Sequence, residues 1–257
     1  MAPATRLFGL IGQTLGHSFS QGYFRQKFWE LGLPDHAYEL FELPTIAGLP
    51  ALLAAHPHLA GLNVTIPYKE AVLPYLDALA PSAARVGAVN TIAIGPGGRL
   101  TGHNTDYVGF RDSLRTFYRP QPGARALLLG HGGAARAVAV ALDDLAIPYQ
   151  TVSRHAQHRG LLYDELTPAL LADYSLIVNT TPLGTFPNVA ASPRLPYAAL
   201  GPQHYLYDLV YNPAETQFLA QGRAAGAHTK NGLDMLHRQA EAAWAIWQGE
   251  AEDSGQA

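Results

Sequence analysis

The sequence of 257 residues contains no cysteine, which excludes disulfide bonds, thiolate catalysis and cysteine-ligated metal sites. It also lacks any apolar run close to the roughly 20 residues that are needed to cross a bilayer. Its first residues show no signal-peptide pattern. We therefore expect a cytoplasmic protein that has no membrane partner.

A strong net charge is missing as well, because the formal charge at neutral pH is −3. Such a chain has no broad attraction for nucleic acid, and any anion site must be local. Four of the 11 histidines, His56, His58, His155 and His158, lie in loops where no carboxylate completes a metal site. We expect no metal and no nucleic acid, and a small molecule is the favoured ligand.

Hydrophobic residues make up 48% of the chain, enough for a substantial core, and they alternate between strand-like and helix-like runs. In the first part we expect strands at 7–11, 37–41 and 61–64, and helices at 20–31 and 46–55. This alternation predicts βαβ units and a largely parallel sheet. Pro96-Gly97-Gly98, between the runs 88–94 and 100–101, predicts a hairpin at an edge of that sheet.

A second α/β series follows a helix expected at 106–117 and a stretch with proline and glycine at 119–123. Its strands are expected at 126–129, 149–152, 176–178 and 205–209. The pattern at 233–247 places apolar residues on one face of a final helix. The polar tail from about residue 249 is expected to fray.

A glycine motif, Gly130-x-Gly132-x-x-Ala135, follows an apolar strand and opens a helix rich in alanine and valine. Gly130 permits a tight turn, Gly132 leaves room for a pyrophosphate, and Ala135 lets helix and strand pack closely. The start of the helix then offers free N–H groups to phosphates. The motif predicts dinucleotide binding, and the alternative is a strand-turn-helix that binds no nucleotide.

The end of the next strand indicates which nicotinamide cofactor is bound. An acidic residue there would bind the ribose of NAD, but the sequence reads Ser153-Arg154-His155. Asp143 and Asp144 come too early in the chain to take that position. Arg154 can pair with a 2′-phosphate, so NADP is favoured; the alternative is a solvated surface arginine.

Lys69 and Asp106 are the residues best suited to proton transfer. Lys69 follows Pro67, which suits the first turn of a helix, and Asp106 could be only a helix cap. Both have small neutral neighbours of the kind that bind polyhydroxylated ligands: Asn63, Thr65, Asn90, Thr91, Asn104 and Thr105. These residues by themselves leave open whether the two are a catalytic pair or ordinary side chains near helix starts.

Eight motifs in order resemble the shikimate dehydrogenase family over nearly the whole chain. They are Gly12-x-x-x-x-His17-Ser18-x-Ser20, Asn63-Val64-Thr65-x-Pro67-x-Lys69, Gly87-Ala88-Val89-Asn90-Thr91, Asn104-Thr105-Asp106-x-x-Gly109-Phe110, the glycine motif, Asn179-Thr180-Thr181-Pro182-x-Gly184, Asp208-Leu209-Val210-Tyr211-Asn212-Pro213 and Asn231-Gly232-Leu233-x-Met235-Leu236-x-x-Gln239. Several positions depart from the family pattern. Thr14 and Gln21 stand where the family often has proline, and Tyr23-Phe24 where it often has His-Asn. His131 replaces a small residue, and Ser153-Arg154-His155 replaces Asn-Arg-Thr.

The resemblance implies a two-domain α/β fold. Residues 1–105 would form an N-terminal α/β substrate domain and residues 106–231 a Rossmann-type, doubly wound NADP-binding domain, with the active site in the cleft between them. Within 232–257, the last helix would return to pack on the first domain. We expect a monomer or a homodimer.

The resemblance also implies the roles of individual residues. Lys69 and Asp106 would be the catalytic pair, bonded to ring hydroxyls of the substrate. Ser18 and Ser20 would hold the substrate carboxylate. The remaining pocket residues would be Thr65, Asn90, Tyr211 and Gln239. The cofactor would contact Gly130, His131, Gly132, Gly133 and Ala134 at its pyrophosphate, Ser153 and Arg154 at its 2′-phosphate, and Leu209 and Gly232 at its nicotinamide.

The implied reaction is the reversible, NADPH-dependent reduction of 3-dehydroshikimate to shikimate in aromatic amino-acid biosynthesis. Lys69 would donate the proton, and the cofactor would carry the hydride. Two alternatives remain open. One is a quinate/shikimate dehydrogenase that uses NAD, and the other is a noncatalytic nucleotide-binding sensor on the same fold.

Overall fold

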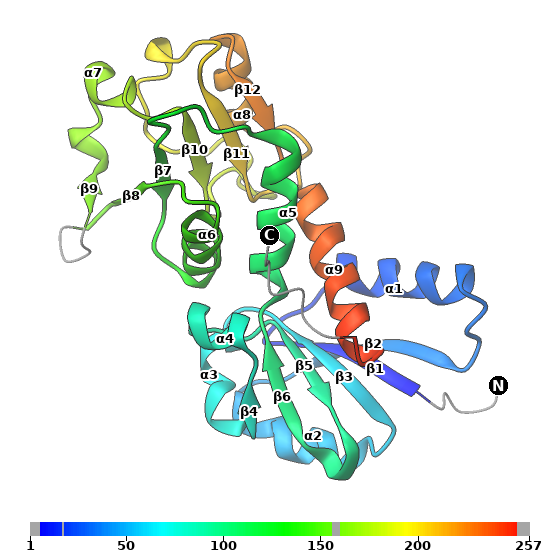
Figure 1. Ribbon diagram of the computed structural model, residues 1–257. Coiled ribbons are helices and arrows are strands. Elements are labelled where there is room, and N and C mark those ends of the chain that lie inside the picture. Colours follow the sequence, from blue (N-terminus) through cyan, green and yellow to red (C-terminus); the bar gives the residue numbers. More distant parts are fainter. Residues whose placement is uncertain (1–5, 17, 156–159, 251–257) are drawn as a thin grey trace. The chain divides into compact units, whose positions relative to one another are not determined.

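The computed structural model describes residues 6–16, 18–155 and 160–250 (Figure 1). The chain divides into two compact units, Met1–Thr105 with Ala240–Ala257, and Asp106–Gln239. The last helix, α9 (Leu233–Trp247), contributes residues to both units. Most of the tail that was expected to fray, from residue 251 onward, lies outside the described residues. The substrate and cofactor roles expected for the two parts of the chain remain predictions.

The first unit contains a six-stranded sheet of order β2-β1-β3-β5-β6-β4. The strands are β1 (Arg6–Gly12), β2 (His36–Glu42), β3 (Leu59–Val64), β4 (Ala78–Leu79), β5 (Thr91–Ile94) and β6 (Leu100–His103). β5 is antiparallel to both of its neighbours, and the other pairings are parallel. The predicted, largely parallel sheet is therefore confirmed.

The predicted hairpin is formed by β5 and β6, and Gly97 and Gly98 turn it with positive φ angles of 71° and 78°. Its predicted place at the sheet edge is wrong, because β4 pairs with the outer side of β6. β4 is only two residues long. A strand that short has no alternating pattern that the sequence could reveal.

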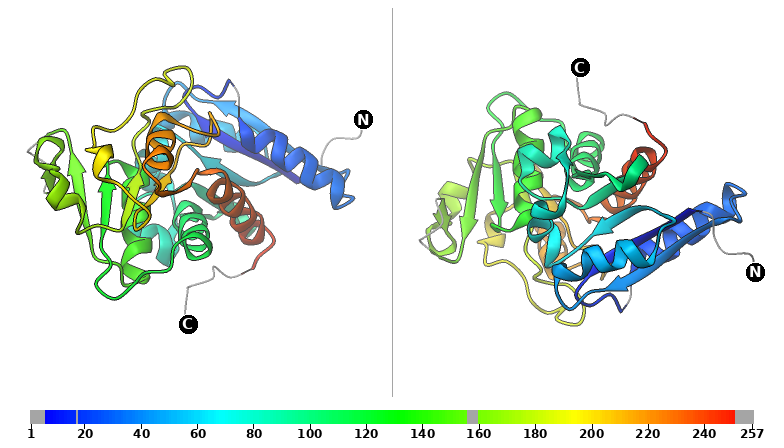
Figure 2. Two further views of the ribbon diagram at one scale, coloured as in Figure 1. Left: turned by 90° about the horizontal axis from the view of Figure 1, so that it is seen from above. Right: turned by 90° about the horizontal axis from the view of Figure 1, so that it is seen from below.

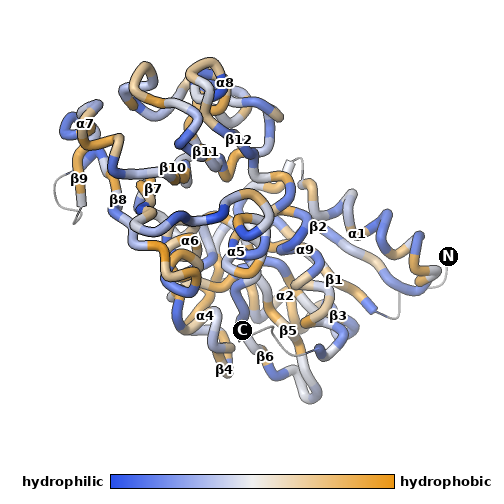
Figure 3. The backbone as a smooth tube through the Cα atoms, turned by 45° about the horizontal axis from the view of Figure 1, so that its top comes forward, coloured by the Kyte–Doolittle hydropathy of each residue, from blue (hydrophilic) through white to orange (hydrophobic). Residues whose placement is uncertain are grey.

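Helices cover both faces of this sheet: α1 (Phe19–Glu30), α2 (Leu49–Ala55), α3 (Tyr68–Ala71), α4 (Pro81–Val86) and the end of α9, with the short 3₁₀ turns η1 (Ile46–Gly48), η2 (Leu73–Tyr75) and η3 (Pro96–Gly98). Side chains alternate along β1. Leu7 and Ile11 face a core with Leu49 of α2, while Phe8 faces a core with Phe24 of α1. α1 is mostly hydrophilic (Figure 3), and Phe24 and Phe28 are its buried residues.

The end of α9 belongs to the aromatic core of the first unit. Trp247 packs against Phe8, with 4.7 Å between the ring centroids, and its indole N–H donates to the Ile92 carbonyl at 3.0 Å. Gly61 leaves the space for this ring, because a Cβ at that position would overlap the indole. Leu233 was expected on the apolar face of the helix, but it is 41% exposed.

The second unit contains a fully parallel sheet of order β12-β11-β10-β7-β8-β9 (Figures 1 and 2). Four predicted strands are confirmed as β7 (Ala126–Leu129), β8 (Tyr149–Ser153), β10 (Leu176–Asn179) and β11 (Tyr205–Asp208). The sequence did not indicate β9 (Leu161–Leu162) or β12 (His228–Lys230), which are too short for periodicity. Strand order reverses between β7 and β10, which is the topological switch point of a doubly wound fold.

Both faces of this second sheet are also covered. Leu127 and Leu129 of β7 share a core with Phe218 of α8, while Phe110 of α5 packs on Tyr207 of β11 with ring centroids 5.0 Å apart. The helices of this unit are α5 (Thr105–Phe117), α6 (Gly133–Asp144), α7 (Pro168–Leu171), α8 (Gln217–Ala224) and the start of α9, with the 3₁₀ turns η4 (Tyr163–Glu165) and η5 (Tyr197–Ala199). In the described part of the chain, no helix is long and apolar enough to span a bilayer.

Candidate active site

Lys69 lies in α3, a single helical turn that follows the end of β3. Thr65 begins the connection, and its N–H donates to the Ile11 carbonyl at 2.9 Å. The predicted place of Pro67 in the first helical turn is wrong: Pro67 precedes the helix at the capping position, after a cis peptide bond. The Lys69 carbonyl accepts a hydrogen bond from Val89 N–H at 2.7 Å, which fixes the half-buried lysine beside the start of β5.

Asp106 is the second residue of α5, so it is not the cap of this helix. A carboxylate in the first turn is stabilised by the helix macrodipole. The preceding residue, Thr105, is fully buried and anchored to Asn90, whose Oδ1 accepts from Thr105 N–H at 2.7 Å. Asn90 Nδ2 also donates to Thr105 Oγ1 at 3.0 Å. Asn90 therefore sets the start of α5 and with it the backbone at Asp106.

A chain of buried hydrogen bonds extends from this point toward the first helix. Asn63 Nδ2 donates to Thr91 Oγ1 at 3.2 Å, and Asn63 Oδ1 accepts from the Tyr38 hydroxyl at 2.8 Å. Tyr38 is also hydrogen-bonded to Ser20, and burial raises its pKa. Because the single Tyr38 proton is donated to Asn63, the Ser20 hydroxyl must be the donor in their bond. No sequence pattern indicated the role of Tyr38.

Ser18 and Ser20 have different surroundings. Ser18 is the capping residue of α1, but its side chain makes no capping bond. Its Oγ is buried and has no hydrogen-bond partner among the described residues, which exclude the neighbouring residue 17. Buried hydroxyls are almost always bonded, so a bare one suits a ligand. Ser20 is the second residue of α1, so it does not cap this helix.

The glycine motif forms the turn between β7 and α6. Gly130 has a φ of 116°, and a Cβ there would lie 2.5 Å from Thr180 Oγ1. Gly132 caps α6, and no heavy atom lies within 4 Å of the place where its Cβ would be. His131 is exposed, and Ala135 is 4% exposed against the sheet. The 12-residue helix α6 therefore begins at an open, glycine-lined position of the kind that binds phosphate.

At the end of β8, Ser153 and Arg154 differ in what they offer a cofactor. The buried Ser153 hydroxyl donates to the His155 carbonyl at 2.7 Å, so it stabilises its own turn. Arg154 is exposed. Arg154 also lies near Tyr163: burial raises the pKa of Tyr163 to about 12, and the arginine opposes that rise. The Tyr163 hydroxyl is buried without a partner in the described structure, and the sequence did not indicate it.

Leu209 and Gly232, which are far apart in the sequence, lie in contact. A Cβ on Gly232 would overlap the Leu209 carbonyl, and Gly232 N–H donates to the Val210 carbonyl at 3.1 Å. Tyr211 is 38% exposed, and burial of its remainder raises its pKa. Gln239 is nearly buried, and its Nε2 donates to the Leu236 carbonyl at 3.1 Å.

The predicted residues thus gather at the strand-end edge of each sheet, which is the edge formed by the ends of its parallel strands. In the first unit, Thr65 and Thr105 follow the parallel strands β3 and β6, and Asn90 precedes the antiparallel β5. In the second unit, Gly130, Arg154 and Leu209 follow β7, β8 and β11. The edge at which parallel strands end is where α/β sheets bind ligands. No group of three or more metal-ligating side chains occurs in the residues that the structure describes.

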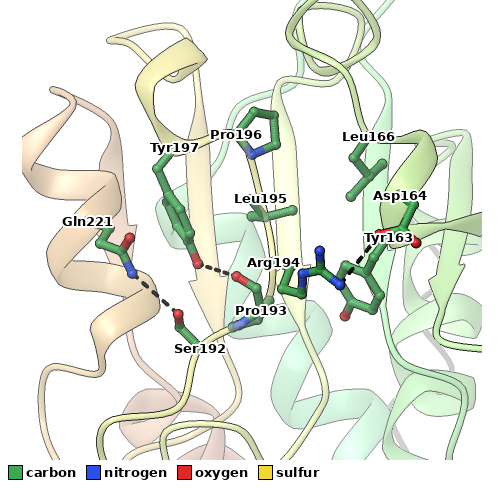
Figure 4. A pocket seen from close by; sticks show the side chains of 10 residues that line it. All are labelled: Tyr163, Asp164, Leu166, Ser192, Pro193, Arg194, Leu195, Pro196, Tyr197 and Gln221. Atoms are coloured by element: carbon green, nitrogen blue, oxygen red, sulfur yellow. Dashed lines mark hydrogen bonds and ion pairs between the residues drawn. The ribbon is translucent and has the colours of Figure 1, made fainter.

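A separate pocket of about 530 Å³ lies on the second unit, between Tyr163, the segment 192–197 and Gln221 (Figure 4). None of the residues predicted to bind substrate or cofactor lines it. Several of its polar groups bond to one another: Tyr197 donates to the Pro193 carbonyl at 2.8 Å, and Gln221 donates to Ser192 at 3.3 Å. These groups already have partners, and no predicted site residue lines the pocket, so the two strand-end edges are the better candidate site.

Comparisons with known proteins show which family the chain resembles. The family model of the shikimate dehydrogenase substrate binding domain matches residues 10–92. A protein of Symbiobacterium thermophilum named shikimate dehydrogenase (NADP(+)) is 41% identical over 95% of this chain and 89% of its own length. The crystal structure of shikimate 5-dehydrogenase from Thermus thermophilus in complex with NADP(H) and shikimate has a TM-score of 0.80 and 34% identity over 97% of this chain and 96% of its own.

A related enzyme with another name is also similar. The structure of quinate dehydrogenase from Corynebacterium glutamicum in complex with NAD has a TM-score of 0.84 and 29% identity, over 96% of this chain and 94% of its own. Similarity of fold therefore does not by itself separate the two substrates.

Proposed function

The chain belongs to the shikimate dehydrogenase family, and from that premise we propose that it catalyses the reversible, NADP-dependent reduction of 3-dehydroshikimate to shikimate. The observation that carries this proposal is the 41% identity to a shikimate dehydrogenase (NADP(+)) over 95% of the chain. The aromatic amino-acid pathway is the corresponding metabolic role.

We propose that the strand-end edge of the second unit holds NADP. Three observations fit a dinucleotide: the positive φ of Gly130, the open space beside Gly132 and the free start of α6. The exposed Arg154 suits a 2′-phosphate because its guanidinium can pair with two oxygens. Ser153 would act indirectly, by holding the turn that presents Arg154.

We propose that Lys69 and Asp106 are the catalytic pair. When bound, the cofactor supplies the hydride. Lys69 donates a proton to the substrate oxygen that becomes a hydroxyl, and its positive charge stabilises negative charge on that oxygen. Asp106 accepts a hydrogen bond from the ring hydroxyl and orients it. Thr65, Asn90, Tyr211 and Gln239 complete the substrate pocket.

We propose that Ser18 and Ser20 bind the substrate carboxylate. The bare, buried Oγ of Ser18 supports this role most directly. Ser20 donates to Tyr38 in the structure, so its hydroxyl must turn to reach a ligand. Hydroxyl donors can bind an anion without a full positive charge, because a bond to a charged acceptor is stronger than a neutral one.

The test is an assay of NADPH oxidation with 3-dehydroshikimate, run beside NADH and beside quinate oxidation with each cofactor. Turnover of 3-dehydroshikimate with NADPH at the highest kcat/KM would support the proposal. A preference for quinate with NAD would favour the function of the quinate dehydrogenase neighbour. NADPH binding without turnover of either substrate would indicate a sensor.

A cytoplasmic location and a monomeric or homodimeric state also remain proposals, tested by cell fractionation and by light scattering.

A further inference from the structure

Asp208, the last residue of β11, is fully buried and accepts three hydrogen bonds. Its Oδ1 accepts from Asn179 Nδ2 at 2.9 Å and from Val210 N–H at 3.0 Å. Its Oδ2 accepts from Thr216 Oγ1 at 2.6 Å. The donors come from three separate segments: the end of β10, the loop after β11 and the residue that caps α8. One carboxylate therefore connects the end of β10, the loop after β11 and the start of α8.

This carboxylate has no basic partner among the salt bridges of the described residues. Tyr197 of η5 is a titratable group that Asp208 influences: burial raises the pKa of Tyr197, and the charge of Asp208 raises it further. Burial likewise raises the pKa of Asp208 to about 6, and its three donors oppose the rise. A buried carboxylate without a cationic partner is costly. Ionisable groups with shifted pKa values occur frequently at functional sites.

Two of the segments that Asp208 connects adjoin residues expected to contact the cofactor. Val210 lies between Leu209 and Tyr211, and its carbonyl accepts from Gly232 N–H at 3.1 Å. On the other side, Asn179 Oδ1 accepts from Thr181 N–H at 3.1 Å. The neighbouring Thr180 hydroxyl donates to the Leu129 carbonyl at 2.7 Å, directly before the glycine motif. The Asp208 network thus extends from the proposed nicotinamide end to the proposed pyrophosphate end.

We propose that Asp208 is a positioning residue, whose carboxylate holds the loop 209–211 and the loop 179–181 in the arrangement that the nicotinamide ring requires. This inference rests on the proposed function. An apolar residue at this position would leave the Asn179 amide, the Val210 N–H and the Thr216 hydroxyl without their acceptor. Unbonded buried donors favour a shift of the backbone, and a displacement of about 1 Å can lower a rate roughly 10²-fold.

Two substitutions of Asp208 separate its hydrogen bonds from its charge. Asp208→Asn keeps one carbonyl oxygen for Asn179 and Val210, while its NH₂ group can donate to the Thr216 oxygen. Asp208→Ala removes every acceptor. Asn179→Ala is a milder variant, which releases the loop at Thr181 while Val210 and Thr216 remain bonded. The matched control is Thr167→Ala, which removes the cap of α7 in the same unit.

The experiment measures kcat, the KM for each substrate and NADPH affinity from nicotinamide fluorescence. For Asp208→Ala we expect kcat to fall roughly 10- to 100-fold with weaker NADPH binding, while the KM for 3-dehydroshikimate changes less than about threefold. Asn179→Ala should show a smaller loss of the same kind, which keeps the inference testable if Asp208→Ala does not fold. Asp208→Asn and Thr167→Ala should stay within about threefold of wild type in all three measurements.

Two results would overturn the inference. One is a wild-type kcat and NADPH affinity in folded Asp208→Ala, or in Asn179→Ala if the first variant does not fold. The other is an equal loss in Thr167→Ala, because a lost cap would then be sufficient to explain it. If wild type binds NADPH but does not reduce 3-dehydroshikimate, the proposed function fails by itself, and altered NADPH fluorescence in Asp208→Ala still supports the positioning role.

Discussion

Ser18 and Ser20 are two positions apart in the sequence, but their hydroxyl groups differ in hydrogen bonding. Ser18 Oγ is buried without a partner in the described structure, while the Ser20 hydroxyl donates to Tyr38. Loss of the Ser18 hydroxyl therefore removes no bond to any residue that the structure describes. Loss of the Ser20 hydroxyl removes one, which is worth about 0.5–1.5 kcal/mol.

We predict that Ser18→Ala lowers kcat/KM for shikimate oxidation roughly 10- to 100-fold, because each hydrogen bond to a charged group contributes about 1.5–3 kcal/mol. Its thermal midpoint should stay near that of wild type. Ser20→Ala should lower kcat/KM and also the thermal midpoint. Unchanged kcat/KM in both folded variants would place the carboxylate site elsewhere.

Lys69 gives the second prediction at the residue scale. Lys69→Ala should lower kcat roughly 10²- to 10⁴-fold with a modest change in substrate KM, because a positioned acid-base group contributes about that much to the rate. Lys27→Ala is the control, since Lys27 is paired with Glu241 in the first unit and is not among the predicted site residues. Near-normal turnover in Lys69→Ala would remove this lysine from the mechanism.

Arg154 gives the third prediction at the residue scale. Arg154→Ala should raise the KM for NADPH far more than the KM for NADH, because only NADPH carries the 2′-phosphate that the guanidinium pairs with. Arg194→Ala, an exposed arginine of the same unit that lies 3.5 Å from Asp164, should leave both values unchanged. An equal loss of affinity for both cofactors would mean that Arg154 contacts another part of the nucleotide.

At the scale of elements, the fit between α9 and the first sheet depends on one missing side chain. Gly61 in β3 leaves the space that the Trp247 indole fills. We predict that Gly61→Ala destabilises the protein by about 1–3 kcal/mol, the usual cost of overpacking a core. Gly22→Ala is the matched control, with the opposite expected effect. Outside its chain neighbours and the backbone of its own helix, no heavy atom lies within 4 Å of the place where a Cβ on this exposed glycine of α1 would be. The change should therefore stabilise the protein by about 0.5–1 kcal/mol. Chemical denaturation measures both, and a stabilised Gly61→Ala would contradict the packing described here.

For the whole molecule, Asp208 predicts an unusual dependence of stability on pH. Its pKa rises from 3.8 to about 6 on folding because the carboxyl is buried. The folded protein therefore binds this proton more tightly than the unfolded chain does, so the contribution to stability is present at low pH and is lost as pH rises through about 6.

Asp234 behaves in the opposite way. Burial acts to raise its pKa, but its bonds to Lys230, Ser113 and Arg238 outweigh this and hold it at about 2, so its contribution is lost as pH falls below about 4.

We predict that the difference in unfolding free energy between wild type and Asp208→Asn shifts in favour of wild type by on the order of 2–3 kcal/mol between about pH 7 and about pH 4. Comparing the two proteins cancels Asp234 and the other titrating groups. Urea unfolding at several pH values measures this difference. A difference that does not vary with pH would mean that Asp208 keeps an ordinary pKa in the folded protein.

Local sequence patterns were sufficient to predict the elements with long, regular periodicity and the sites made by neighbours in the chain. The apolar runs of β7 and β10 and the glycine motif between β7 and α6 could be predicted because strand periodicity and the tight turn depend on adjacent residues. The motifs around Lys69 and Asp106 were visible for the same reason.

Which side chains are available and which are already bonded became visible only in the folded chain. Ser153 stabilises its own turn, Ser20 donates to Tyr38, and Asp208 accepts from Asn179, which is 29 positions away. The two-residue strands β4 and β9 likewise exist only through their neighbours, and β4 moves the β5–β6 hairpin away from the sheet edge. Such partners are set by strand register and packing between residues far apart in the chain, and no local sequence pattern encodes that information.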